Sequence, residues 1–445
     1  MNILFKSLCL LVLYTLLSAS SENNGNKEFL SFLDNEWNYK LSQNPVYATR
    51  MGVKGYETEW RDNSLEAIRN RVSHSKGILE SLKEFNVENL SEVNKLNLRL
   101  FTQLTSNDLE ISKYNRHFLP FGHRGGVQLA HEDAEVIPLK SYDDFYFWIQ
   151  RLQNLDKRID QNITLAEIGL EKGYKPPKVL MDRVYRQIVL QSQSDVLSSP
   201  FYKVFIDLPD SISYEDQIIL RQQAQKVIKE TVLPSYKKLE EFFNKKYLKQ
   251  SRETVGLYDI PDGRKLYEAL AKSFTTTDLS PKEIHQIGLD EVQRIRGEME
   301  GVIDELKFEG SFKDFLTFLR EDKRFYYDTP EELFEGYLAV SKRIDPELVK
   351  LFGNLPRTPY GLRAIPEESA PDTTTAYYMS PSPDGLRAGY YYVNLYKPET
   401  RPKFEMEVLS VHEAVPGHHL QIALAMEMEE IPMFRRVSPY TAFVE

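Results

Sequence analysis

The chain has 445 residues, enough for roughly two to four domains or one large fold with several lobes. Asp and Glu (66) outnumber Lys and Arg (56), so the formal net charge is −10. An acidic chain without a basic block lacks the electrostatic footprint of nucleic-acid-binding proteins, and we expect no nucleic acid among its partners. Aromatic residues make up 12% of the chain, which supplies apolar surface for a core and excludes long-range disorder.

The N-terminus is typical of a secretory signal peptide, which we place at residues 1–20. Met1–Lys6 carries one positive charge, Ser7–Leu17 is apolar but too short to span a bilayer as a helix, and small residues follow at Ser18–Ser21. Cys9 lies inside the apolar run rather than after it, so it does not support lipid attachment. We expect cleavage to leave a cysteine-free chain that is exported, periplasmic or secreted, with no stable membrane insertion.

Helical periodicity dominates residues 21–445, which we expect to form a single multi-lobed region because no repeat or linker divides them. Two helix starts are marked by an N-cap hydroxyl followed by proline, at Ser280-Pro281 and Thr329-Pro330. Pro234 is expected to kink or break a long helical segment. The sequence therefore predicts a mainly α-helical fold, with apolar residues at helical spacing over 63–115, 140–170, 213–250, 280–308 and 329–352.

The region between Pro356 and Lys403 differs from the rest because it is rich in proline and contains two short β-rich stretches. These stretches are Thr373–Met379 and Ala388–Tyr396, and Pro381–Gly385 between them has the composition of a turn. We expect a β-hairpin or two strands of a small sheet. The flanking prolines favour an edge position for these strands.

A histidine-rich motif follows in a segment that is again helical: His412-Glu413-Ala414-Val415-Pro416-Gly417-His418-His419. A catalytic zinc site needs three nitrogen or oxygen ligands from the protein and one open position for water. In the common helical motif H-E-x-x-H the second histidine stands four residues after the first, where this chain has Pro416. The pattern indicates a metal site, whereas the alternative is a kinked helix whose histidines face solvent.

The spacing of the histidines requires a distorted helix. On a regular helix His418 lies about 120° from the face of His412, and His419 lies about 10.5 Å further along the axis. Proline removes a backbone hydrogen bond and glycine tolerates unusual dihedral angles, so we expect a widened turn at Pro416-Gly417 that returns His418 to the face of His412. The spacing leaves His418 and His419 both open as the second ligand.

With this motif the sequence resembles a large family of exported bacterial proteins of unassigned function that carry an H-E-x-x-P-G-H-H motif. That family is grouped with gluzincin-type zinc metallopeptidases such as thermolysin and thimet oligopeptidase. The resemblance is most specific at His412–Gln421, and it extends to Tyr390–Tyr396, Pro177–Asp182, Thr275–Asp278, Ile284–Gly288 and Leu355–Tyr360. It implies a mainly α, two-lobed, metallopeptidase-like helical fold with a small β-sheet next to the zinc helix.

The resemblance implies Zn²⁺ held by His412, His418 and a third ligand. Gluzincins take this third ligand from a glutamate on a following helix, and Glu445 is the position that matches, because Thr441–Glu445 is similar to the start of the family's next motif. Rival carboxylates on the zinc helix itself would point away from the metal; they are Glu427, Glu429 and Glu430. Family members continue past this motif, so the resemblance also implies truncation at the C-terminus.

The function implied is that of an exported zinc-dependent peptidase acting on short peptides, with Glu413 as general base for a metal-activated water. Tyr390, Tyr392 and Asn394 are the candidate substrate-binding residues, on a strand expected to pair with an extended substrate. The alternative is a non-catalytic exported metal- or peptide-binding protein on the same fold. Three further histidines could line a cleft from the other lobe, although a solvated loop is the simpler interpretation: His117, His123 and His131.

Overall fold

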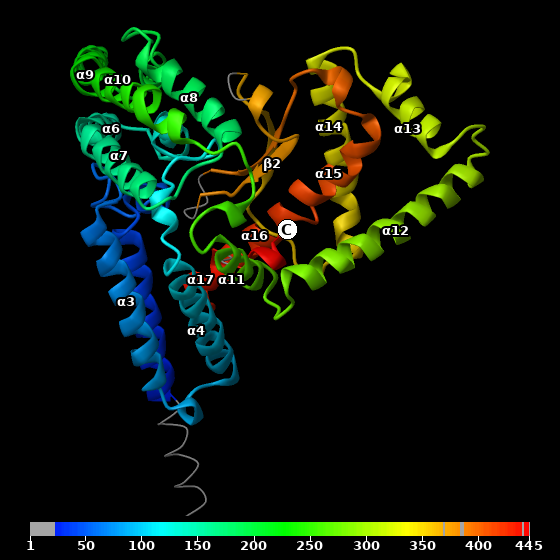
Figure 1. Cartoon of the computed structure of the whole chain (residues 1–445), viewed down its shortest axis with the longest axis horizontal. Helices are drawn as coiled ribbons and strands as arrows, with labels where there is room; N and C mark the ends of the chain where they lie inside the picture. Colours follow the sequence, from blue (N-terminus) through cyan, green and yellow to red (C-terminus); the bar gives the residue numbers. More distant parts are fainter. Residues whose placement is uncertain (1–22, 368–369, 383–386, 438–439, 445) are drawn as a thin grey trace, which may run out of the picture. The chain divides into compact units, whose positions relative to one another are not determined.

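The computed structural model describes residues 23–367, 370–382, 387–437 and 440–444 (Figure 1). The predicted signal peptide, the candidate ligand Glu445 and most of the predicted turn at 381–385 lie outside the described residues. The chain divides into two compact units, Met1–Leu270 and Ala271–Glu445. Among the described residues, no helix combines the length and the apolar character that a bilayer span requires.

The first unit is built from helices. The chain is helical over 23–42, and the helices that follow are α2 Pro45–Arg50, α3 Leu65–Lys83, α4 Glu92–Ser112, α5 Asp133–Val136, α6 Tyr142–Gln153, α7 Leu155–Glu171, α8 Lys178–Ser192, α9 Tyr214–Val227, α10 Leu233–Phe242 and α11 Gly263–Thr275. Helices α3 and α4 lie side by side (Figure 1), and each begins at a serine whose hydroxyl accepts a hydrogen bond from the backbone. A π-helical turn at Ile228–Val232 joins α9 to α10 just before Pro234, so the helix is distorted near this proline but continues without a break.

The core of the first unit is aromatic. Trp148, Phe205, Tyr236 and Phe243 are almost completely buried at its centre. The buried hydroxyl of Tyr236 donates a hydrogen bond to the carbonyl of Val127, 2.5 Å away, so that its burial leaves no polar atom unsatisfied. This core accounts for the stability of a unit that carries no disulfide.

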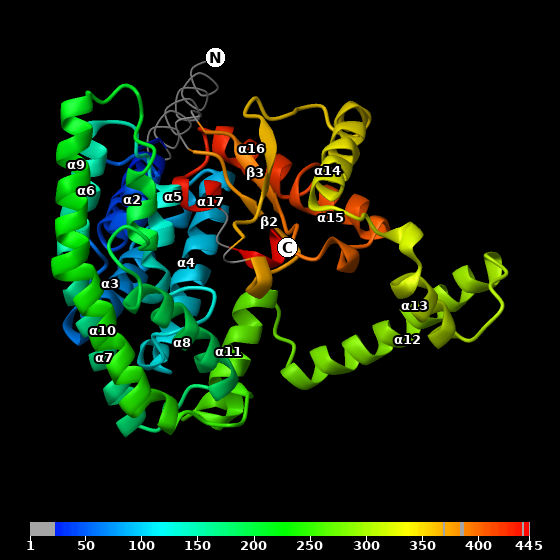
Figure 2. The same cartoon turned by 90° about the horizontal axis from the view of Figure 1, so that it is seen from above.

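The second unit combines helices with a small sheet (Figure 2). Its helices are α12 Pro281–Glu305, α13 Phe312–Glu321, α14 Pro330–Ile344, α15 Met406–Glu413, α16 His418–Glu427 and α17 Met433–Arg436, and its strands are β1 Tyr360–Ala364, β2 Ala376–Met379 and β3 Gly389–Val393. The hydroxyls of Ser280 and Thr329 cap α12 and α14, which confirms both predicted helix starts. The predicted mainly helical fold with a small sheet is therefore confirmed.

The strand order of the sheet is β1-β3-β2. Strand β3 pairs in parallel with β1 and antiparallel with β2, so the two predicted strands are neighbours as expected. The predicted edge position of β3 is wrong, because β3 lies in the middle of the sheet and β1, which the sequence pattern did not indicate, covers its other side. A middle strand has its backbone groups engaged on both sides and cannot add a substrate strand.

One face of the sheet packs against the helix that carries the histidine motif. Along β3 the residues alternate between buried and half-buried, and the buried Tyr391 and Val393 contact Leu333 and Tyr337 of α14 and Met406 of α15. Because side chains alternate across a strand, Tyr390 and Tyr392 lie on the opposite face. The small sheet thus lies next to α15, as the sequence predicted.

Candidate metal centre

The helical path is interrupted inside the histidine motif. Helix α15 ends at Glu413 and α16 begins at His418, with the non-helical segment 414–417 between them. Both ends of this segment leave helical geometry: Ala414 has φ −102° and ψ −100°, and Gly417 has φ −78° and ψ −130°. The peptide bond between Val415 and Pro416 is cis. The expected widened turn within one helix is therefore a complete break between two helices.

Gly417 is required where this segment folds back on the end of α15. A Cβ atom at this position would lie 1.9 Å from the carbonyl oxygen of His412 and 2.4 Å from that of Val411, far inside van der Waals contact. Hydrogen bonds then restart the chain as a helix, because the N–H of His419 donates to the carbonyl of Ala414 at 2.9 Å. The absence of a side chain at Gly417 thus allows the two helices to approach each other closely.

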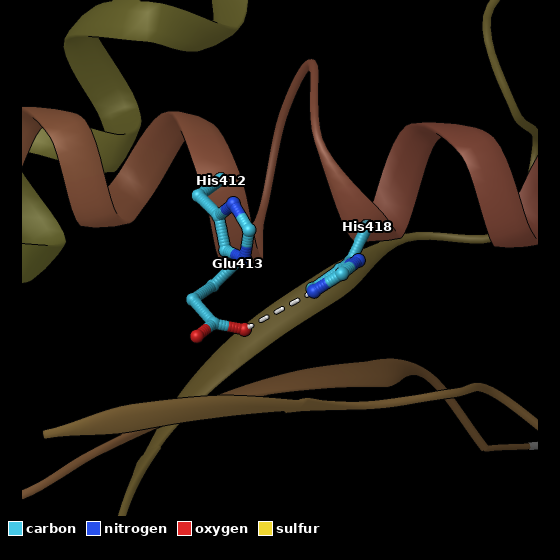
Figure 3. A group of neighbouring side chains, drawn as sticks. All are labelled: His412, Glu413 and His418. Atoms are coloured by element: carbon cyan, nitrogen blue, oxygen red, sulfur yellow. Dashed lines mark ion pairs between the residues drawn. The ribbon is translucent and has the colours of Figure 1, made fainter. Parts of the chain in front are cut away.

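The break brings His412, Glu413 and His418 together (Figure 3). One possible ligand atom from each residue lies within 4.8 Å of those of the other two, and within the described residues no other trio of His, Cys, Asp or Glu meets this condition. The two imidazole rings have their centroids 4.6 Å apart, and Glu413 Oε2 lies 3.9 Å from His418 Nε2. We call these three residues the histidine–glutamate cluster.

The donor set of the histidine–glutamate cluster suits zinc. Zinc binds imidazole nitrogen and carboxylate oxygen at about 2.0–2.2 Å, so tetrahedral ligand atoms lie about 3.4 Å from each other. The possible ligand atoms of the cluster would therefore have to move about an ångström closer to one another to bind an ion. Glu413 and His418 are buried, whereas His412 is exposed, so the cluster is reachable from solvent.

His419 is not part of the cluster and has other contacts. Its side chain is buried, its Nδ1 is hydrogen-bonded to the hydroxyl of Tyr378 at 2.9 Å, and its ring packs against Tyr360. Burial lowers the pKa of His419 to about 4. Of the two histidines that the spacing left open, His418 is therefore the one that lies beside His412.

Tyr378 of β2 is a residue of this site that the sequence interpretation missed. Its ring lies over His418, with centroids 6.2 Å apart, while its hydroxyl contacts His419. Gly389 on β3 leaves room for this contact, because a Cβ atom there would lie 2.2 Å from the Tyr378 hydroxyl oxygen. Alternation along β2, which places Tyr378 opposite the buried Tyr391, was the signal that could have identified it.

Replacing Tyr378 by phenylalanine is expected to lower the free energy of unfolding by about 1–3 kcal/mol, because it leaves the buried Nδ1 of His419 without its hydrogen bond. Urea denaturation followed by circular dichroism measures this difference. The matched control is Tyr396→Phe, at a tyrosine that is 42% exposed, with an expected change below about 0.5 kcal/mol. Equal stability of the two variants would show that the hydrogen bond does not stabilise this site.

The three predicted substrate-binding residues do not lie at the cluster. Tyr392 stacks on Tyr377 with ring centroids 4.8 Å apart, and Tyr390 lies under the guanidinium of Arg363, both on the face of the sheet away from α15. The reason is the alternation of β3, which turns Tyr391 toward the helices instead.

Asn394, which directly follows β3, has a structural role: its side chain holds the loop that precedes β2. Its side chain is 1% exposed, and its Nδ2 donates to the carbonyls of Ala370 and Thr374, while its Oδ1 accepts from the N–H of Tyr396. These contacts use both N–H donors of the amide and one acceptor site of its oxygen, and the side chain is buried, so it does not face a substrate.

The family described as "Bacterial protein of unknown function (DUF885)" matches residues 45–445. A solved structure described as that of "the putative lipoprotein from Colwellia psychrerythraea" has a similar fold, with a TM-score of 0.82 and 24% sequence identity over 95% of this chain and 76% of the other. None of the curated proteins matches. Because the family match spans most of its sequence, the chain belongs to the DUF885 family of bacterial proteins of unknown function.

Proposed function

We propose that this protein is an exported zinc-dependent hydrolase that cleaves peptide bonds. The observation that carries the proposal is the break at 414–417, which places two imidazoles of one short motif within reach of a single ion and the carboxylate of Glu413 beside them. The resemblance of the motif to those of gluzincin metallopeptidases supports a peptide substrate. The predicted signal peptide, residues 1–20, supports export to the periplasm or the exterior.

The residues of the motif take different roles in this proposal. His412 and His418 would hold the ion through ring nitrogens, and Glu445 is the candidate for the third ligand. Zinc, when bound, supplies a Lewis acid that polarises a carbonyl and acidifies a water. Glu413, whose carboxylate lies 3.9 Å from His418 Nε2, would take up a proton as general base and return it to the leaving amine.

An extended peptide substrate is expected to lie along β2. This strand is at an edge of the sheet, whereas β3 is in the middle, and β2 carries Tyr378 over His418. Edge strands bind extended peptides through backbone hydrogen bonds. We therefore assign substrate pairing to β2 instead of β3, the strand that the sequence interpretation had chosen.

The zinc content of the purified protein tests the proposal. After dialysis against trace zinc, the chain is expected to hold about one zinc ion, and His412→Ala and His418→Ala are each expected to lower zinc affinity at least about tenfold, because each removes a ligand. His285→Ala is the matched control, since His285 is an exposed histidine of α12 in the same unit. Zinc binding that is equal in all four proteins would refute the assignment of the cluster as a metal site.

A further inference from the structure

The first unit contains a positively charged cavity in a protein whose net charge is −10. The cavity has a volume of about 440 Å³ and is bordered by α3 and the residues before it, by α4 and the residues after it, and by α7. Three arginines and a histidine line it, namely Arg61, Arg71, Arg116 and His117, against one carboxylate, Asp108. We call it the arginine cavity.

Two arginines of this cavity donate hydrogen bonds to neutral groups rather than to carboxylates. Arg61 Nη1 donates to Asn44 Oδ1 at 2.8 Å, and Arg71 Nη1 donates to the backbone carbonyl of Asp62 at 2.9 Å. Within the part of the chain that the structure describes, neither of them nor Arg116 forms an ion pair. Arg61 and Arg71 are thus oriented by neutral acceptors, and the carboxylate of Asp62 acts on Arg71 electrostatically without a direct ion pair.

The positive groups also act on one another. Burial lowers the pKa of Arg61, and the charge of Arg71 lowers it further. Burial and the charge of Arg71 also lower the pKa of His117, so at neutral pH this imidazole is uncharged and the positive charge of the cavity comes from the arginines. Asp108 is the one carboxylate among the described residues that line the cavity, and it cannot balance the charge of the arginines because its own negative charge also interacts with Lys40. An anion placed among these groups would remove their mutual repulsion.

The walls of the arginine cavity are partly apolar. Ile68 and Val72 of α3 face it, and both also border an adjoining cavity of about 810 Å³. That second cavity is lined by further apolar side chains, among them Leu65, Ile111 and Phe118. A ligand with a charged head among the arginines could therefore bury an apolar body next to it.

We propose that the arginine cavity binds a small organic anion, a carboxylate or phosphate head carried on an apolar body. The planar guanidinium matches the oxygens of either head in paired hydrogen bonds. The volumes of the two cavities are those of small-molecule sites, which range over about 300–1,000 Å³. The site is made by residues of the first unit alone and does not depend on the proposed hydrolase activity.

Isothermal titration calorimetry with four probes tests this site: octanoate, octyl phosphate, octanol and inorganic phosphate. At least one of the two amphipathic anions is expected to bind about tenfold more tightly than octanol, which lacks the charge, and than inorganic phosphate, which lacks the apolar body. The comparison of octanoate with octyl phosphate identifies the head group. Affinity is expected to fall as the salt concentration rises, because the contact is ionic.

Arginine variants locate the site. Arg71→Gln and Arg116→Gln are each expected to lower the affinity about fivefold or more, whereas Arg99→Gln, an exposed position of α4 outside the arginine cavity, leaves it within about twofold. Arg116 is itself exposed, so its replacement keeps the fold intact and the test valid even where Arg71→Gln unfolds. The proposal is overturned if neither octanoate nor octyl phosphate binds more tightly than both octanol and inorganic phosphate, or if the affinity is unchanged in both cavity variants.

Discussion

Replacing Glu413 by glutamine is expected to lower the rate constant of peptide hydrolysis by a factor of about 10²–10⁴, the usual contribution of a general base. The carboxamide has nearly the shape of the carboxylate and fits its buried position, but it cannot accept a proton. Zinc affinity is expected to persist because Glu413 is not one of the proposed ligands. Cleavage of a peptide mixture by the zinc-loaded protein, followed by mass spectrometry, measures the rate, and elemental analysis measures the metal.

The matched control is Glu407→Gln, which changes an exposed glutamate of the same helix and is expected to leave the rate within about twofold. Turnover that is unchanged in Glu413→Gln would remove this residue from the reaction. If neither the wild-type protein nor the variant cleaves any peptide while both still bind one, the non-catalytic binding protein becomes the better description.

The chemistry of the histidine motif could be predicted from its residues, but its backbone path could not. Proline lacks a backbone N–H and glycine lacks a side chain, so a disturbed helix at Pro416-Gly417 follows from local chemistry. Whether the disturbance is one wide turn or a complete break depends on contacts that form only in the fold. These include the packing of Gly417 against the His412 carbonyl and the hydrogen bond of His419 to Tyr378 on a strand.

The position of each strand in the sheet could not be predicted from the sequence, for a related reason. Alternation along Gly389–Val393 shows which residues share a face, but it does not show which face meets the helices. That choice, and the central position of β3, depend on the parallel pairing with Tyr360–Ala364, which carries no clear strand pattern. For this reason the sequence interpretation chose Tyr390 and Tyr392 as substrate-binding residues, although Tyr391 is the residue that faces α15.

The arginine cavity has no counterpart in any local motif. Arg61, Arg71 and Arg116 come from three separate segments, and only the packing of α3 beside α4 brings them together. His117 was considered from the sequence as a residue of a solvated loop, and the structure places it in the cavity wall. A site of this kind forms only when separate segments pack together, so neither the composition nor the residue spacing of the sequence predicts it.

Replacing Gly417 by alanine is expected to disrupt the histidine–glutamate cluster without removing any of its side chains. The new Cβ would lie 1.9 Å from the carbonyl oxygen of His412, so the segment 414–417 must move and carry His418 with it. We expect zinc affinity to fall at least about tenfold, and the free energy of unfolding to fall by about 1–3 kcal/mol, as for other forced overpacking. Zinc titration and urea denaturation measure the two effects.

Gly297→Ala is the matched control because a Cβ at this exposed position of α12 would meet no atom within 4 Å. There the same change is expected to raise the free energy of unfolding by about 0.4–1 kcal/mol, since alanine favours a helix and restricts the unfolded chain. The two glycine substitutions should therefore differ in sign. If Gly417→Ala binds zinc as tightly as the wild-type protein, the close approach of the two helices is not what assembles the cluster, and the metal site loses its structural basis.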